Sequence, residues 1–193
     1  MKKAKKVLLL VLCAALLVGA TIAGTVAYLT STTTEVKNTF TAGNVTITLD
    51  EAPVDLYGKV VVGGRVTENE YKLIPGHTYA KDPTIHVGAD SEECWVFAKL
   101  VDGLGDASAI TINAGWTLVP TTDGSVVYAY NTKMTAGQST APLFSQFTFA
   151  ENANPETYTN ASITIIGYAV QADGFASAEA AWAAAPATWP TGN

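Results

Sequence analysis

Two histidines are the residues best suited to chemistry in this chain, His77 in PGHTYAKDP and His86 in TIHVGAD. If a hairpin brought them together with Asp82 or Asp90, the three side chains would offer the nitrogen and oxygen ligands of a zinc site. Neither histidine belongs to an H-E-x-x-H pair, in which both ligands share one helical face. The spacing therefore fits ordinary strand or surface histidines better, and we predict no catalytic, cofactor-binding or metal-binding residue.

The other polar clusters have no recognisable ligand pattern. Asp90 and Ser91–Glu93 are acidic enough to hold calcium if a loop gathers their oxygens, but they lack the spaced D-x-[DN]-x-[DN]-G ligand order. We expect a solvated turn there, and a plain strand connection at Gly103–Ser108, which opens no phosphate-binding helix. Asn44 and Asn160 begin N-glycosylation sequons, which matter only in a host that glycosylates.

The first 27 residues have the layout of a secretory signal peptide. Four lysines precede an apolar stretch, Val7–Ala20, which is rich in Leu, Val and Ala. Thr25 and Ala27 supply the small side chains that a signal peptidase requires before the bond it cuts. Cleavage after Ala27 leaves Tyr28 as the first residue of the mature chain.

Other interpretations of the leader stay open. Cleavage after Ala23 is the weaker alternative site. An uncleaved membrane anchor is another, because Val7–Val26 is close to the ~20 residues that span a bilayer; the chain would then touch the membrane only through its leader. A lipoprotein at Cys13 fits less well, since Leu12 and not a small residue precedes it.

The mature chain is strongly acidic. Residues 28–193 hold seven Lys and Arg against seventeen Asp and Glu, a net charge of −10 with both histidines neutral. Such a surface repels nucleic acid and anionic lipid, so no nucleic-acid partner is expected. Cys94 is the one cysteine after the leader, which excludes an intramolecular disulfide, and its apolar neighbours in CWVFAKL predict a buried thiol.

Short antiparallel strands are predicted for most of the chain after residue 43. In NVTITLD, Asn44–Asp50, apolar and polar residues alternate, which predicts a strand with one buried face. Glycine and aspartate at Gly63–Gly64 and Asp123–Gly124 predict two hairpin turns. We predict further strands at Gly58–Val62, Tyr71–Leu73, Thr84–Val87, Cys94–Val101, Ile110–Asn113, Trp116–Val119, Val126–Tyr130, Phe144–Phe149 and Ser162–Gln171.

These elements predict an all-β fold, a two-sheet antiparallel β-sandwich of jelly-roll or Greek-key type with one short C-terminal helix. The strands CWVFAKLV and ITIIGYAV are apolar on both faces and should lie at its centre. The helix lies in SAEAAWAAAP, with Ser177 as its N-cap, Glu179 in its first turn and Pro186 at its end. The expected core aromatics are Trp95, Phe97, Trp116, Phe147, Phe149 and Tyr168.

The stretch between the leader and the first strand, residues 28–43, is predicted to be a β-arm. One face of an extended arm holds Tyr28, Thr30, Thr32, Thr34, Val36, Asn38 and Phe40, whereas Leu29 begins the other. About thirteen extended residues reach roughly 40 Å, far enough to lie along another domain. The arm is either a strand donated to a neighbouring protomer, the first strand of its own sandwich (residues 44–193), or a frayed terminus.

A family resemblance favours donation. The segment GTVAYLTSTTTEVKNTFTAGNVTITLDE, Gly24–Glu51, closely resembles the start of the TasA and camelysin (CalY) family of exported Gram-positive proteins. The resemblance implies processing by a SipW-type signal peptidase and a jelly-roll subunit of biofilm-matrix fibres, whose mature N-terminus is donated to the next copy. Weaker similarity to the family follows in IPGHTYAKDPTIHV, CWVFAKL and YAVQADGFASAEAAW.

The sequence therefore predicts a secreted, non-enzymatic matrix protein that forms a head-to-tail homopolymer, and an accessory matrix protein is the second partner considered. The self-assembly residues are Tyr28, Leu29, Thr30, Thr32, Thr34, Val36 and Phe40. A monomeric surface adhesin or accessory matrix protein is the next alternative. A camelysin-like secreted metalloprotease is the third, although no metal motif supports it.

Overall fold

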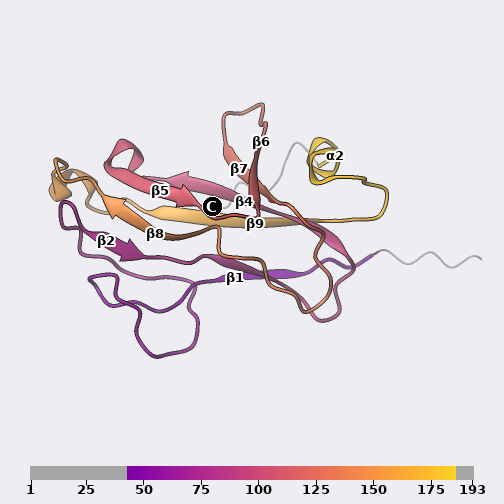
Figure 1. Cartoon of the computed structure of the whole chain (residues 1–193), viewed down its shortest axis with the longest axis horizontal. Helices are drawn as coiled ribbons and strands as arrows, with labels where there is room; N and C mark the ends of the chain where they lie inside the picture. Colours follow the sequence, from indigo (N-terminus) through magenta and orange to yellow (C-terminus); the bar gives the residue numbers. More distant parts are fainter. Residues whose placement is uncertain (1–42, 186–193) are drawn as a thin grey trace, which may run out of the picture. The chain divides into compact units, whose positions relative to one another are not determined.

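The structure is a computed structural model that describes residues 43–185 (Figure 1). Antiparallel strands form nearly all of its regular structure, with one α-helix, α2 (Ala178–Ala183), and two 3-10 turns, η1 (Gly105–Ala107) and η2 (Pro155–Tyr158). The strands are β1 (Ile47–Asp50), β2 (Thr78–Ala80), β3 (Thr84–Val87), β4 (Cys94–Asp102), β5 (Ser108–Ile112), β6 (Trp116–Val119), β7 (Val126–Tyr130), β8 (Phe144–Phe149) and β9 (Ile163–Gln171). Within the described range, no helix has the length and apolar character needed to cross a membrane.

One layer is a four-stranded sheet with the order β6-β7-β4-β9. Strands β4 and β9 pair along their whole length, from Cys94 opposite Gln171 to Asp102 opposite Ile163. The hairpin predicted at Asp123–Gly124 joins β6 to β7, and Gly124 has the positive φ of 77° that such a turn requires. The two predicted central strands are therefore neighbours, with β4 inside the sheet and β9 along its edge.

The other layer contains β2, β8 and β5, in that order, and the pair β1-β3. The two parts are joined through the segment that precedes β8. Ser139 bridges to His86 of β3, and the Thr140 amide donates to the Ile85 carbonyl at 2.9 Å. The chain before and within β8 therefore runs along β3 and then along β2.

The core explains why β4 is apolar on both faces. Cys94, Val96 and Ala98 point into the core between the layers, together with residues of β3, β6 and β8. Trp95 and Phe97 point the other way, where α2 and its buried Ala181 cover the outer face of the sheet (Figure 1). All six predicted core aromatics are buried, and the predicted all-β sandwich with one short helix is confirmed.

The helix begins as its sequence predicts. The Ser177 hydroxyl accepts a hydrogen bond from the Ala180 amide at 3.2 Å, which satisfies one of the free amides of the first turn. Glu179 lies in that turn, where a negative charge complements the helix dipole. Pro186, the predicted helix stop, lies outside the described residues.

The strand and hairpin predicted around Gly58–Val62 and Gly63–Gly64 are wrong. Asp55 accepts hydrogen bonds from the amides of Tyr57 and Lys59, both at 2.9 Å, so the chain turns where a strand was expected. Only Val60 forms a bridge, and its partner is Val54, which precedes it. The segment is instead a loop whose ends meet at a bridge between Glu51 and Val66.

The strand predicted at Tyr71–Leu73 is also wrong, although its alternation is real. Tyr71 and Leu73 pack against a buried cluster while Lys72 is exposed. The Lys72 amide donates to the Leu56 carbonyl of a loop, at 2.7 Å, and not to a strand. The alternation of apolar and polar residues here reflects which side chains are buried, and the segment forms no β ladder. Strand β2, which the sequence did not predict, follows a few residues later.

Candidate functional site

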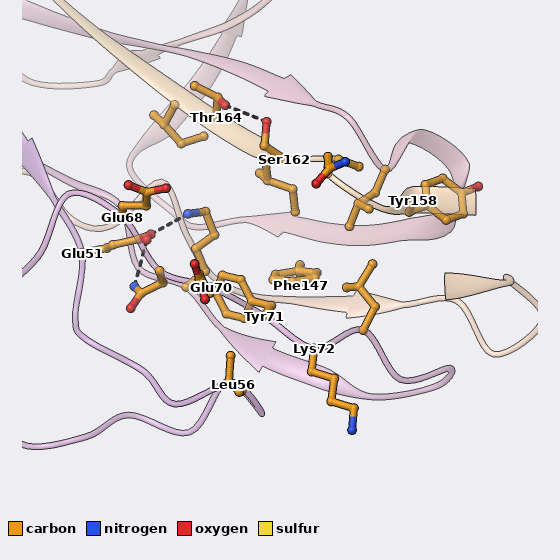
Figure 2. A pocket seen from close by; sticks show the side chains of 18 of the residues that line it. Glu51, Leu56, Glu68, Glu70, Tyr71, Lys72, Phe147, Tyr158, Ser162 and Thr164 are labelled. Atoms are coloured by element: carbon orange, nitrogen blue, oxygen red, sulfur yellow. Dashed lines mark hydrogen bonds and ion pairs between the residues drawn. The ribbon is translucent and has the colours of Figure 1, made fainter. Parts of the chain in front are cut away.

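An open groove of about 1160 Å³ lies among the described residues. It lies between the extended segment 67–73 on one side and residues 160–165, which lead into β9, on the other. In Figure 2, Ser162 and Thr164 face Glu51, Tyr71 and Phe147 across the open space. Its volume is slightly above the ~300–1,000 Å³ of most small-molecule pockets.

The groove exposes a strand edge of β9. The Gly103 amide donates to the Ser162 carbonyl and the Ala172 amide donates to the Glu93 carbonyl, both at 2.8 Å. The backbone amides and carbonyls of even-numbered residues in β9 therefore point towards β4. Because hydrogen-bonding direction alternates along an antiparallel strand, the amides and carbonyls of Ile163 and Ile165 point away from β4. No backbone group of residues 43–185 pairs with them.

Strand β1 presents a second unpaired edge beside the groove. The Gly88 amide donates to the Thr46 carbonyl at 2.9 Å, so the backbone amides and carbonyls of even-numbered residues in β1 point towards β3. The backbone amide and carbonyl of Leu49 therefore point away from β3. Farther along, β1 and β9 approach each other, since a Cβ on Gly167 would lie 3.3 Å from Ile47 Cδ1. The two edges thus converge at Gly167 and separate at the groove.

The floor of the groove is apolar and aromatic. Phe147 and Leu104 are buried there, and the Tyr71 ring packs edge-on against Phe147 with ring centroids 5.3 Å apart. The Tyr71 hydroxyl donates to the Ala80 carbonyl at 3.1 Å. Burial, with the nearby charges of Glu51 and Asp82, raises the pKa of Tyr71 well above its usual value, so it stays a neutral donor at physiological pH.

A buried ion pair forms part of the groove wall. Lys81 Nζ lies 2.6 Å from Glu51 Oε2, and the other Glu51 oxygen accepts from the Asn69 amide group at 2.9 Å. Asn69 also donates to the Ala52 carbonyl at 2.9 Å and accepts from the Val54 amide at 3.0 Å. This network fixes the point at which the chain leaves β1, and it leaves neither charge available to a substrate.

A second cluster surrounds Asp50. Arg65 pairs with the Asp50 carboxylate and, at 3.0 Å, with Asp82. His86 Nε2 lies 2.8 Å from the same Asp50 oxygen that Arg65 contacts. Partial burial works against ionisation, but hydrogen bonds from Arg65 and His86 outweigh it and lower the pKa of Asp50.

Ser139, His86 and Asp50 have the residue types of a hydrolytic triad. His86 Nδ1 lies 2.6 Å from Ser139 Oγ, so the imidazole bridges the serine and the aspartate. In a working triad the carboxylate stabilises the imidazolium that forms. Here Arg65 already neutralises that carboxylate, and Ser139 is exposed, so the arrangement fits a cross-strand polar ladder better than a nucleophile.

The structure keeps the two histidines in separate environments. His77 Nε2 lies 2.9 Å from the Tyr57 carbonyl, and its ring packs edge-on against Tyr79, whereas His86 belongs to the Asp50 cluster. Among residues 43–185, no group of three or more His, Cys, Asp or Glu side chains is placed to hold a metal ion. The zinc arrangement considered with Asp82 or Asp90 is therefore not formed by these residues.

The other predicted features can be located directly. Cys94 is fully buried, and burial raises the pKa of its thiol, which confirms an inert cysteine. Ser91 is buried in the turn that precedes β4, where its hydroxyl accepts from the Thr46 amide at 3.2 Å. The β4–β5 connection runs through η1 at Gly103–Ser108, as predicted. Asn160, the start of a predicted sequon, is exposed at the groove and has a φ of 65°.

The predicted cleavage and assembly residues all fall outside the described range. These are Ala27, Tyr28, Leu29, Thr30, Thr32, Thr34, Val36 and Phe40. Of the predicted arm, residues 28–43, the structure describes Gly43 alone. These predictions therefore stay predictions.

Sequence reasoning missed the groove because three distant segments build it. Its apolar signal was present in Tyr71 and Leu73, but it was assigned to a strand. Its free edge could not be recognised before the partner of β9 was known. Comparison with models of known protein families, with curated proteins and with solved structures finds no significant match to this chain.

Proposed function

We propose that this chain is a secreted structural protein that assembles into head-to-tail fibres by donating its mature N-terminal arm, residues 28–43, to the next protomer. It is processed by a SipW-type signal peptidase and works outside the cell, in the matrix or at the cell surface, as the resemblance to TasA and camelysin implies. An accessory matrix protein is an additional partner in this proposal. It requires no cofactor and no catalytic residue.

One observation carries the proposal. The described domain leaves strand edges of β1 and β9 unpaired beside a single groove. Backbone donors and acceptors along such an edge gain hydrogen bonds when an extended segment is added to it. Because the arm and the edge are different surfaces of one protomer, each contact leaves a free arm and a free edge, and growth does not close.

Electron microscopy of the mature protein, beginning at Tyr28, tests the proposal. The net charge of −10 opposes association, so filaments are expected in added salt or at mildly acidic pH. A variant that lacks residues 28–39 should stay monomeric under the same conditions. Equally long filaments without the arm would refute strand donation.

A monomeric surface adhesin is the second candidate, and one observation favours it. The loop after β1 exposes an apolar group, with Val62 fully exposed and Leu56, Tyr57 and Val60 each more than half exposed. Exposed apolar patches are common at binding surfaces. A mature protein that stays monomeric, yet binds cells or matrix through this loop, would favour the adhesin. The metalloprotease alternative gains no support from the described residues.

A further inference from the structure

We propose that the groove beside Ile163–Ile165 of β9 is the acceptor site, and that its occupant is the arm of a second copy of this chain. This inference rests on the proposed fibre function and assigns that function to one edge. The arm adds a strand along β9 at the wide end of the gap between β9 and β1. The apolar face of the arm then covers the floor formed by Phe147 and Leu104.

The hydrogen-bonding groups of the groove are set for an added strand. Ile163 and Ile165 direct their amides and carbonyls towards the opening, and their side chains turn inward onto the core between the layers. Thr164 lies between them, exposed on the outer face. An incoming strand can therefore satisfy both backbone groups at Ile163 and Ile165 without disturbing the β4–β9 pairing.

The arm matches the groove in polarity. One arm face carries Val36 and Phe40 among threonines, and the groove floor is apolar. The rim carries more negative than positive charge: Glu68, Glu70 and Glu156 line the groove together with Lys72, and none of the four forms an ion pair with another described residue. An anionic ligand would be repelled there, whereas the side-chain charges of residues 28–43 cancel, with Glu35 balanced by Lys37, and cleavage after Ala27 adds a positive α-amino group at Tyr28.

The start of the described chain favours an arm from another copy. Gly43, where the arm joins the domain, lies beside Glu92 and Gln171, because a Cβ on Gly43 would contact both side chains. Gln171 ends β9, whereas the groove lies at its beginning. The eight residue steps between them span roughly 26 Å. From Gly43 the chain itself runs through β1 towards the groove, since Ile47 lies beside Gly167 and Leu49 and Asp50 line the groove. An arm that precedes Gly43 would therefore have to reverse direction and run back over this distance to fill the groove of its own chain.

One competing acceptor is the outer edge of β6, at the opposite side of the same sheet; β2 and β5 are the edge strands of the three-stranded sheet. Strand β6 also lacks a second neighbour among the described residues. Thr117 of β6 is exposed, as is Thr164 of β9, and both lie on the face of the sheet that carries Trp95 and Phe97. The two threonines therefore form a matched pair of test positions.

Disulfide trapping between two singly substituted mature proteins tests the acceptor. One protein carries Ser31→Cys, Thr33→Cys or Glu35→Cys on the arm, and the other carries Thr164→Cys or the control Thr117→Cys. Native Cys94 is buried and does not interfere. After mixing under assembly conditions and mild oxidation, at least one arm position should cross-link to position 164 about tenfold more than to position 117, because a bound strand raises the local concentration.

The outcomes separate this inference from the fibre proposal. Preferential cross-linking to position 117, or equal cross-linking to both positions, would overturn the β9 assignment and leave strand donation intact. A third protein carries an arm cysteine and Thr164→Cys in one chain. If it forms an internal disulfide while the two singly substituted proteins do not cross-link to each other, the arm fills the groove of its own chain, and the assignment to a second copy is overturned. Filaments that form without residues 28–39 would instead overturn the fibre proposal.

A backbone variant provides an independent test. Ile165→Pro removes an amide that points into the groove and keeps the β4–β9 hydrogen bonds, since proline is tolerated at a strand edge. Ile165→Ala truncates the same side chain but keeps the amide. If both variants fold by circular dichroism, only Ile165→Pro should lose filaments; normal filaments from Ile165→Pro would overturn the inference. If Ile165→Pro does not fold, the cross-linking result decides.

Discussion

Lys81 Nζ lies 2.6 Å from Glu51 Oε2, and the two side chains expose only 11% and 4% of their surface. This pair joins the end of β1 to the residue that follows β2, so it holds one wall of the groove in place. The ion pair Lys133–Glu93, at 3.3 Å, has side chains that are 39% and 46% exposed. The chain thus contains a buried and an exposed ion pair for comparison.

Lys81→Met should lower the free energy of unfolding by about 3 to 5 kcal/mol, because it leaves the buried Glu51 carboxylate without its counter-charge. Lys133→Met should lower it by less than about 1 kcal/mol, since water screens the exposed pair. Urea denaturation followed by tryptophan fluorescence measures both. Similar losses in the two variants would show that the Glu51–Lys81 pair is not held in a buried environment.

Asp50 should make stability depend on acid. Its pKa in the folded protein lies below the ordinary value of an aspartate, because hydrogen bonds from Arg65 and His86 outweigh the effect of burial. A lowered pKa contributes stability that is present above the unfolded value and is lost as pH falls through the folded one. The urea midpoint of the wild type should therefore fall more between pH 5 and pH 3 than that of Asp50→Asn. If the urea midpoints of the wild type and Asp50→Asn fell equally between pH 5 and pH 3, Asp50 would not be a source of the acid dependence of stability.

The arm should tolerate charge on one face only. Thr34 belongs to the face with Val36 and Phe40, whereas Thr33 belongs to the other face. Thr34→Asp and Val36→Asp should each abolish filaments seen by electron microscopy, because burying an unpaired carboxylate is costly. Thr33→Asp is the matched control and should assemble normally. Loss of filaments in Thr33→Asp but not in Thr34→Asp would mean that the face is assigned wrongly.

Ser139 should not react as a nucleophile. A fluorophosphonate probe is expected to leave the native mature protein unlabelled, because Arg65 already neutralises the Asp50 carboxylate that His86 contacts. Ser139→Ala should change the free energy of unfolding by no more than about 0.5 kcal/mol, as expected for an exposed side chain. Mass spectrometry of labelled peptides measures the first result. Labelling that Ser139→Ala abolishes would reveal a serine hydrolase.

The sequence predicted strands well where they were long and apolar or clearly alternating. Cys94–Val101 and Ser162–Gln171 match β4 and β9 nearly to the residue, because both faces of the sheet are covered and the apolar runs are continuous. Prediction failed at β2, which has only three residues. The reason for its burial is tertiary: the Tyr79 hydroxyl donates to the Lys72 carbonyl and accepts from the Ile74 amide, both at 2.7 Å.

The groove was out of reach for a related reason. An alternating pattern reports which side chains are buried and says nothing of which backbone groups find a partner. Tyr71 and Leu73 alternate with Lys72 as strand residues do, but they cover a cluster and form no ladder. The open edge at Ile163 and Ile165 depends on β1 pairing with β3 and not with β9, a choice made by the assembled layers.

The loop between Glu51 and Val66 is closed at its neck by two backbone hydrogen bonds of 2.8 Å, and a Cβ on Gly64 would contact nothing within 4 Å. The first half of the loop is held to β2, because the Gly58 carbonyl accepts a hydrogen bond from the Ala80 amide at 3.0 Å, whereas no backbone hydrogen bond within residues 43–185 holds Gly63 or Gly64. Lengthening a loop of this kind costs little, about 0.6 kcal/mol for each doubling. A foreign epitope inserted after Gly63 would be carried outward without strain on the domain, and a polymer of such subunits would present it at regular intervals along its length.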